Sequence, residues 1–345
     1  MVYILIMLLI LYGGGTEQPD EINQKYTKDK FVTFRALLAI QIVFGHTFPD
    51  NAYGITVLDK ILLPFNNTGF LCTALFFFLS GYGVYESAKK RGGYFEHYIS
   101  KKVITILVPY WIINIAYLAA DYATSGAIDL RNLCISSVWP VYNRAAWYVI
   151  SVFIVYFFMY FTMHLLKLKH TKMYIAMAGL LIVYTVVFYL LKCGSQWFVS
   201  TFAVLFGILF SDYKEKILRK SNLLLEVAVF TLLYVGMLWR RDYVPYSGKA
   251  IIKIILSLIA PLIVVTIMEK RRVETKWLNY IGAASYEIYL VQGLFVQYLK
   301  LPDTQLFMVE VSPLVNVILA VLTGVLVSKP IGMIVSGLQK RMISS

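Results

Sequence analysis

The 345-residue chain has few charged side chains. Asp, Glu, Lys and Arg make up 15% of its residues, whereas a soluble domain carries about 25%. Apolar residues make up 59%, and the mean hydropathy is +0.69. A large hydrophobic core does not account for so strong a shift, which is typical of a chain whose solvent is mostly lipid.

Several binding and catalytic motifs are absent as well. The chain has no Walker loop, dinucleotide fingerprint, H-E-x-x-H or G-x-S-x-G motif. Its three cysteines, Cys72, Cys134 and Cys193, form no C-x-x-C or Cys/His ligand spacing. We therefore expect no metal and no redox pair. A Cys134–Cys193 disulfide is one alternative for these thiols, and burial as small hydrophobic side chains is the other.

The net charge of +13 raises the question of a nucleic-acid partner. Such a partner would need a basic face on a soluble fold. Here the Lys and Arg residues fall in short clusters between apolar runs, as in the cytoplasmic loops of membrane proteins. The charge pattern therefore predicts no nucleic-acid binding.

The apolar runs predict the fold. A spanning helix needs about 20 mostly apolar residues, and ten such runs follow one another with only short loops between them. The predicted fold is an all-α, polytopic integral membrane protein of about ten transmembrane helices, without a soluble domain. The predicted helices are 31–48, 69–86, 103–121, 146–166, 173–191, 196–212, 222–239, 249–268, 277–299 and 311–336.

Lys and Arg also predict the direction of each helix. If the residues before the first run are cytoplasmic, 21 of the 32 basic residues lie in inner loops and 8 in outer loops. This asymmetry follows the positive-inside rule. We expect a plasma or inner membrane protein in the lipid bilayer, with both termini cytoplasmic. The first, third, fifth, seventh and ninth runs then cross from the cytoplasmic side of the membrane to the outer side.

The predicted membrane domain covers residues 28–340, and a cytoplasmic tail covers 341–345. Residues 1–27 begin with an apolar run, 1–12, that three glycines follow. Twelve helical residues reach about 18 Å, less than the hydrocarbon core of about 30 Å. A partial extra span, an interfacial helix and an extension from a misplaced start codon are the alternatives for this segment.

Two ionisable residues in the first run are the main candidates for function. Arg35 and His46 are eleven positions apart, which places them on one helix face about 16 Å apart. An arginine near the inner side suits a phosphate-bearing ligand, and a buried imidazole suits a general base. A snorkelling arginine and a packed histidine are the structural alternatives. Gln41 lies about 120° from Arg35 and need not share this face.

Several motifs in consistent order resemble the acyltransferase-3 family, whose members O-acylate surface polysaccharides and related acceptors. After the R-x10-H spacing come L-F-F-F-L-S-G-Y at 75–82 and L-V-P-Y-W at 107–111. Further matches are A-W-Y-V at 146–149, Q-W-F…G-I-L-F across 196–210 and I-G-A-A-S-Y-E-I-Y-L at 281–290. The likeness covers residues 28 to about 340.

The resemblance implies functional residues. The family's essential arginine and histidine correspond to Arg35 and His46, and its phenylalanine-rich turn to Phe77, Ser80 and Gly81. Acetyl-CoA is the implied co-substrate, bound from the cytosol. The residues expected to bind it are Arg35, Ser80, Lys89, Lys90, Arg91, Lys101 and Lys102.

The chain also departs from the family pattern. Lys101 and Lys102 stand where the family often has an arginine pair, and Gln292 stands where a histidine is common. Glu287 lies about 15 Å into the ninth run and is a third catalytic candidate: it orients His46, balances a basic group or lines a water-filled groove.

For the saccharide acceptor, the expected contacts are Trp147, Tyr148, Trp197 and Gln292. An aromatic belt at the membrane interface is the alternative for the aromatic residues.

The predicted function is a membrane O-acetyltransferase that uses acetyl-CoA and a cell-surface or lipid-linked saccharide, with His46 as general base. An acyl-histidine intermediate is an alternative to direct transfer. A succinyl or other acyl donor is an alternative to acetyl-CoA. A transporter, flippase or polymerase for lipid-linked saccharides is the alternative from other classes, although the chain shows no internal repeat. The oligomeric state is left open.

Overall fold

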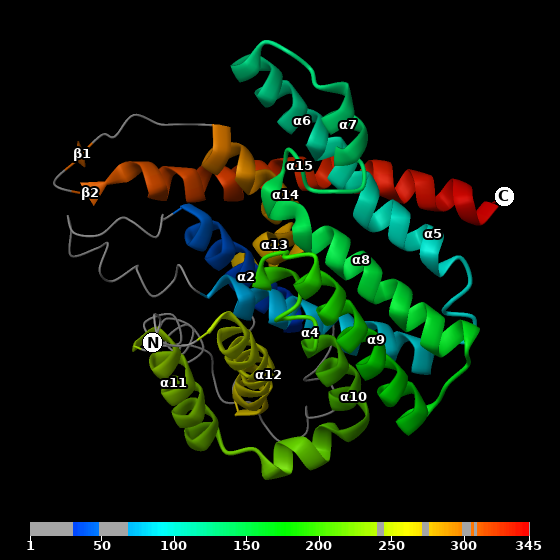
Figure 1. The fold of residues 1–345 in the computed structure, drawn as a ribbon. Coiled ribbons are helices and arrows are strands. Elements are labelled where there is room, and N and C mark those ends of the chain that lie inside the picture. Colours follow the sequence, from blue (N-terminus) through cyan, green and yellow to red (C-terminus); the bar gives the residue numbers. More distant parts are fainter. Residues whose placement is uncertain are drawn as a thin grey trace. The chain divides into compact units, whose positions relative to one another are not determined.

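The computed structural model describes residues 30–47, 68–239, 245–270, 276–298, 305–306 and 309–344. The apolar N-terminal segment and the loop before residue 68 lie outside these ranges, so the predictions for residues 1–27 stay predictions. The described chain is helical apart from one pair of two-residue strands (Figure 1). Its residues divide into two compact units, each of which is described by itself.

The first unit combines residues 70–96 and 155–274 with Phe31. Its central helix, α4, packs against α10 through two glycines. A Cβ atom at Gly81 would lie 2.1 Å from the Val204 carbonyl oxygen, and one at Gly207 would lie 2.2 Å from that of Phe78. These glycines let the two backbones approach directly. The elements of this unit are α4 (Gly69–Lys90), the end of α8 (Trp147–Tyr160), a π-helix (Phe161–Leu165), α9 (His170–Leu190), a 3-10 helix (Ser195–Trp197), α10 (Ala203–Lys220), α11 (Leu223–Trp239) and α12 (Tyr246–Lys270).

The second unit combines residues 32–69, 97–154 and 275–345. Its two strands pair antiparallel, with Gln305 opposite Glu310. Its elements are α2 (Lys30–Thr47), α5 (Tyr98–Lys102), a π-helix (Val103–Leu107), α6 (Val108–Ser125), α7 (Leu130–Ser136), a 3-10 helix (Arg144–Ala146), the start of α8, α13 (Lys276–Ala283), α14 (Ser285–Gly293), a π-helix (Leu294–Tyr298), β1 (Gln305–Leu306), β2 (Val309–Glu310) and α15 (Val311–Ser344).

The predicted polytopic fold is confirmed, but fewer helices meet the requirements of a full span. Each of the ten predicted runs contains helix. Within the described ranges, however, six helices are long and apolar enough to cross a membrane, or seven if α10 and α11 form one span bent by 101°. The chain is a multi-pass membrane protein.

The smaller number of spanning helices, compared with the ten predicted, has identifiable causes. The first run forms only a short apolar helix, α2, and the ninth is interrupted at Ala284, which has φ −92° and ψ 8°. The sixth and seventh runs meet at Ser221, which adopts an extended conformation with ψ 134°. Irregular backbone at membrane depth requires cover by protein or contact with water. The hydropathy of a run does not reveal such breaks.

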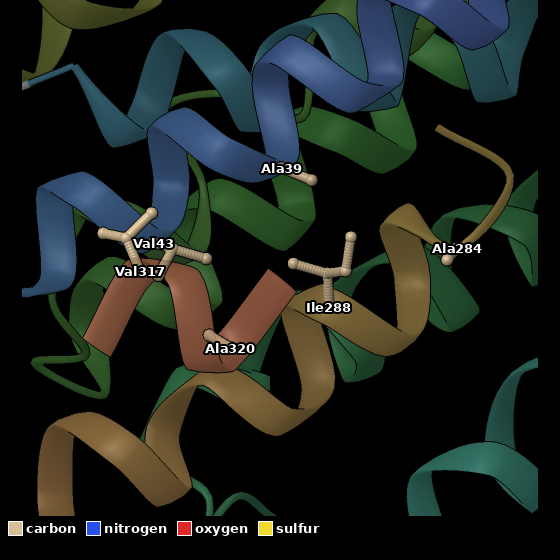
Figure 2. Close-up of a cluster of buried hydrophobic side chains, with 6 residues drawn as sticks. All are labelled: Ala39, Val43, Ala284, Ile288, Val317 and Ala320. Carbon is tan, nitrogen blue, oxygen red and sulfur yellow. The ribbon is translucent and has the colours of Figure 1, made fainter. Parts of the chain in front are cut away.

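A small hydrophobic cluster joins three helices of the second unit (Figure 2). Ala39 and Val43 of α2 meet Ala284 and Ile288, at the start of α14, and the α15 residues are Val317 and Ala320. Three of the six members are alanines, and small residues let membrane helices pack closely. The cluster fixes α2 and α15 against α14.

Gly324 permits the closest part of this packing. A Cβ atom there would lie 2.5 Å from the Ile288 Cα atom, whereas one at Gly332, farther along α15, would meet no atom within 4 Å. We predict that Gly324→Ala destabilises the protein by about 1–3 kcal/mol because α15 must move away from α14. Gly332→Ala is the matched control and should be neutral. Thermal unfolding in detergent measures both, and equal melting temperatures for the two variants would contradict the packing described here.

Candidate active site

Arg35 and His46 lie on one continuous helix, as predicted. Because α2 runs unbroken from Lys30 to Thr47, the two side chains share a face and are about 16 Å apart along the axis. Arg35 is half-buried. His46 is in the last turn of α2 and is exposed, in contrast to the buried position that the sequence suggested.

Two hydrogen bonds fix α2 beside α13 and α14. The Thr33 hydroxyl donates to Asn279 Oδ1 at 2.5 Å, and His46 Nδ1 lies 3.1 Å from Gln292 Oε1. Both pairs are separated by 246 positions in the sequence. Two helices that keep a constant offset over more than three turns run parallel and in register. This direction agrees with the prediction that the first and ninth runs cross the membrane the same way.

The face of α2 between Arg35 and His46 is closed. Ala39 and Val43 lie on it at helical spacing, and they are 1% and 0% exposed in the cluster of Figure 2. The structure fills this stretch with apolar side chains, so any ligand that reaches both residues passes beside the cluster.

Gln292, the hydrogen-bond partner of His46, lies on a backbone segment that other side chains hold in place. Gln292 is 0% exposed. Two positions earlier, the Leu290 carbonyl oxygen accepts hydrogen bonds from the Tyr117 hydroxyl at 2.8 Å and from Asn143 Nδ2 at 2.9 Å. A Cβ atom at Gly293 would lie 2.4 Å from the Tyr117 hydroxyl oxygen, so glycine permits this approach.

Tyr117 and Asn143 were not among the residues singled out from the sequence. The residues themselves carry no signal there, because Tyr and Asn in apolar runs have many uses. The position of Gln292 did carry one, as a departure from the family pattern.

Glu287 is associated with Arg35. It is half-buried on α14, and the positive charge of Arg35 acts on its carboxyl group. The contact with His46 is made by Gln292 instead. Of the roles considered for Glu287, that of orienting the histidine is therefore filled by Gln292.

Lys89, which we expected to bind acetyl-CoA, is held by two carboxylates of the first unit. Its Nζ atom is 2.7 Å from Glu86 Oε1 and 3.3 Å from Asp212 Oδ1. It also donates to the Ser211 carbonyl oxygen at 3.1 Å, beside the kink of α10 at Tyr213. Lys89 thus ties α4 to the kinked part of α10.

The same cluster includes two tyrosines. Asp212 Oδ2 accepts hydrogen bonds from the Tyr85 hydroxyl, at 2.7 Å, and from the Tyr174 hydroxyl. Glu86 accepts one from Ser211 Oγ at 2.5 Å. The charge of Lys89 is therefore met within the protein, which argues against a main role in phosphate binding.

The other residues expected to bind acetyl-CoA have varied surroundings. Lys90 pairs with Glu86 at 3.1 Å and its side chain is 75% exposed, and Arg91 is exposed. Ser80 Oγ accepts from the Tyr156 hydroxyl at 3.0 Å. Lys101 and Lys102 are half-buried in the second unit, with Lys102 Nζ 5.3 Å from the centre of the Tyr98 ring.

Two of the three aromatic residues expected to contact the saccharide are packed inside the protein. Trp197 is 6% exposed and stacks on Phe188 with ring centres 5.0 Å apart. Tyr148 is 9% exposed and meets the ring of Tyr289 edge-on at 5.6 Å. Trp147 is half-buried and contacts Tyr148.

The second unit therefore contains Arg35, His46, Lys101, Lys102, Trp147, Tyr148, Glu287 and Gln292, whereas the first contains Ser80, Lys89, Lys90, Arg91 and Trp197.

Acidic, histidine and cysteine side chains show no metal site in the part of the chain that the structure describes: no three of them come together. Cys72, Cys134 and Cys193 are free thiols, and of these Cys134 is exposed. One alternative from the sequence was that these cysteines are buried as small hydrophobic side chains. This is correct for Cys72 and wrong for Cys134.

The surroundings of Lys89 and Lys90 predict different effects of one substitution. Lys89→Met removes two carboxylate contacts and leaves the charges of Glu86 and Asp212 less compensated, so we expect a clear fall in the melting temperature. Lys90→Met removes one exposed ion pair and should change it little. Thermal unfolding in detergent compares the two. A stable Lys89→Met protein that binds acetyl-CoA poorly would instead identify Lys89 as a phosphate ligand.

One comparison with known proteins found a match. Searches of curated proteins and of solved structures found no match to the chain. The family model described as an acyltransferase domain, that of the acyltransferase-3 family, matches residues 31–333. The match lies inside the predicted domain of residues 28–340 and includes Arg35, His46, Glu287 and Gln292. The chain is therefore a membrane protein that belongs to the acyltransferase-3 family.

Proposed function

We propose that the protein transfers an acetyl group from cytosolic acetyl-CoA to a hydroxyl of a cell-surface or lipid-linked saccharide. The observation that supports this best is the placement of Arg35 and His46 on one face of α2, in a chain of an acyltransferase family. The enzyme acts in a plasma or inner membrane with both termini cytoplasmic. It needs no metal.

Arg35 binds the phosphates of acetyl-CoA in this proposal. It lies in the second turn of α2, at the end that the positive-inside rule predicts to be cytoplasmic. Lys101 and Lys102 belong to the same unit and come just before the next run that is predicted to cross outward, so they supply further positive charge for the phosphates in this proposal. A guanidinium presents a planar pair of donors to phosphate, whereas lysine supplies a point charge.

His46 is the general base. Its imidazole accepts the proton of the acceptor hydroxyl as the oxygen attacks the thioester carbonyl carbon. A C–O bond forms, the C–S bond breaks, and the imidazolium returns the proton to the departing CoA thiolate. The products are the acetyl ester and CoA, so the step balances without an oxidant, a reductant or a bound metal.

The acceptor reaches His46 from the end of α2 opposite to Arg35. The exposure of His46 in the last turn supports this approach because a saccharide hydroxyl can contact the ring without entering the helix bundle. Trp147, at the start of α8, is half-buried and contacts Tyr148 edge-on. It is the aromatic candidate for stacking on a sugar. Trp197 is too buried for this role.

Replacement of His46 tests the base. We expect His46→Ala to lower acetyl transfer by about 10²–10⁴-fold, the usual contribution of a general base, without removing the protein from the membrane. Label from radioactive acetyl-CoA in the saccharide fraction measures transfer, and the mass added to the saccharide distinguishes acetyl from succinyl. His170→Ala, an exposed histidine at the start of α9, is the control. Undiminished transfer by His46→Ala would overturn the assignment.

A conservative change tests Arg35. Arg35→Lys keeps the charge but loses the planar pair of donors, so we expect KM for acetyl-CoA to rise about tenfold or more. Arg131→Lys, the same change at an exposed site on α7, should leave KM unchanged. If both variants show the parent KM, Arg35 is an interfacial anchor and does not bind the donor.

A further inference from the structure

The imidazole of His46 has a neutral hydrogen-bond partner. Its Nδ1 atom lies 3.1 Å from the amide oxygen of Gln292. An amide oxygen only accepts, so this contact requires a proton on Nδ1. A neutral imidazole with its proton on Nδ1 has its lone pair on Nε2, on the opposite side of the ring.

We propose that Gln292 is the positioning residue of His46, which it holds in the Nδ1–H tautomer so that Nε2 faces the acceptor hydroxyl. This inference rests on the proposed role of His46 as general base. It assigns Gln292 a task in proton transfer rather than the direct acceptor contact that the sequence suggested.

The surroundings of Gln292 support a positioning role. The Thr33–Asn279 hydrogen bond fixes α13, the helix before α14, against α2. The hydrophobic cluster of Figure 2 packs the start of α14, which carries Gln292, against the same helix. The Leu290 carbonyl oxygen, one half-turn before it, is held by Tyr117 and Asn143. A side chain on so well-fixed a backbone keeps the imidazole in one orientation.

Burial of Gln292 has a cost that packing alone does not explain. Its Nε2 donor is buried without a hydrogen-bond partner among the residues that the structure describes. An unsatisfied buried donor costs about 1–3 kcal/mol, so an apolar residue of the same length would suit a purely structural position better. The oxygen, which His46 uses, is what the position requires.

A neutral partner also suits the chemistry. A carboxylate beside His46 would favour the imidazolium, which cannot accept a proton. The amide fixes the tautomer without adding this charge. His46 can then stay neutral, and active as a base, at a lower pH than it could beside a carboxylate.

Two substitutions at Gln292 test the proposal. Gln292→Met has nearly the same shape, and its thioether sulfur is only a weak acceptor for the Nδ1 proton, so we expect kcat to fall about 10- to 100-fold with KM for acetyl-CoA unchanged. Gln292→Glu keeps an acceptor and should retain most of kcat at alkaline pH. Its carboxylate raises the pKa of His46, so the acid limb of the pH profile should move to higher pH.

Gln41→Met is the matched control. Gln41 is 2% exposed, lies in the same unit and donates to Thr68 Oγ1 at 2.7 Å. The same substitution there should leave kcat and the pH profile unchanged. The pair His46→Ala and Gln292→Met should be non-additive, because a positioning residue has no effect once the base is gone.

The outcomes are distinguishable. If His46→Ala loses transfer but Gln292→Met keeps the parent kcat, the positioning role is wrong and the general base stands. If Gln292→Glu loses as much as Gln292→Met at every pH, the amide acts as a donor to Nδ1 and the proposed tautomer is wrong. If His46→Ala keeps full activity, both proposals are overturned.

Discussion

The parallel contact between α2 and the α13–α14 segment is the constraint on which the candidate active site depends. Two hydrogen bonds with the same 246-residue offset set its register, and the small cluster of Figure 2 fills the space between them. Helices in a membrane gain little from the hydrophobic effect, so close packing and interhelical hydrogen bonds must hold them together. Here the same contacts that associate the helices also place His46 against Gln292.

This arrangement gives the polar residues of the site different surroundings along one helix. Near its start, Arg35 is half-buried and acts on the carboxyl group of Glu287. At its end, His46 is exposed and contacts a neutral amide. The guanidinium thus lies toward one end of α2, and a group that must change protonation state lies at the other. A donor with phosphates and an acceptor with a free hydroxyl are matched to these two ends in the proposed reaction.

The first unit concentrates its own charges at the end of α4. Lys89 lies between the carboxylates of Glu86 and Asp212 where α10 is kinked. A broken helix in lipid leaves backbone carbonyl groups that need donors, and Lys89 supplies one to Ser211. A basic residue in the last turn of a membrane helix can serve topology and packing, so its position does not by itself identify a phosphate site.

The sequence by itself determined the helical membrane fold, the family resemblance and the shared face of Arg35 and His46. Hydropathy, motif order and helical periodicity can be read along the chain without knowing which residues pack together. Tertiary structure decided the rest: the breaks at Ser221 and Ala284, the closed stretch between the two polar residues, and the partners of His46 and Lys89. A contact such as His46 with Gln292 joins residues 246 positions apart. Only the packing of the helices brings them together.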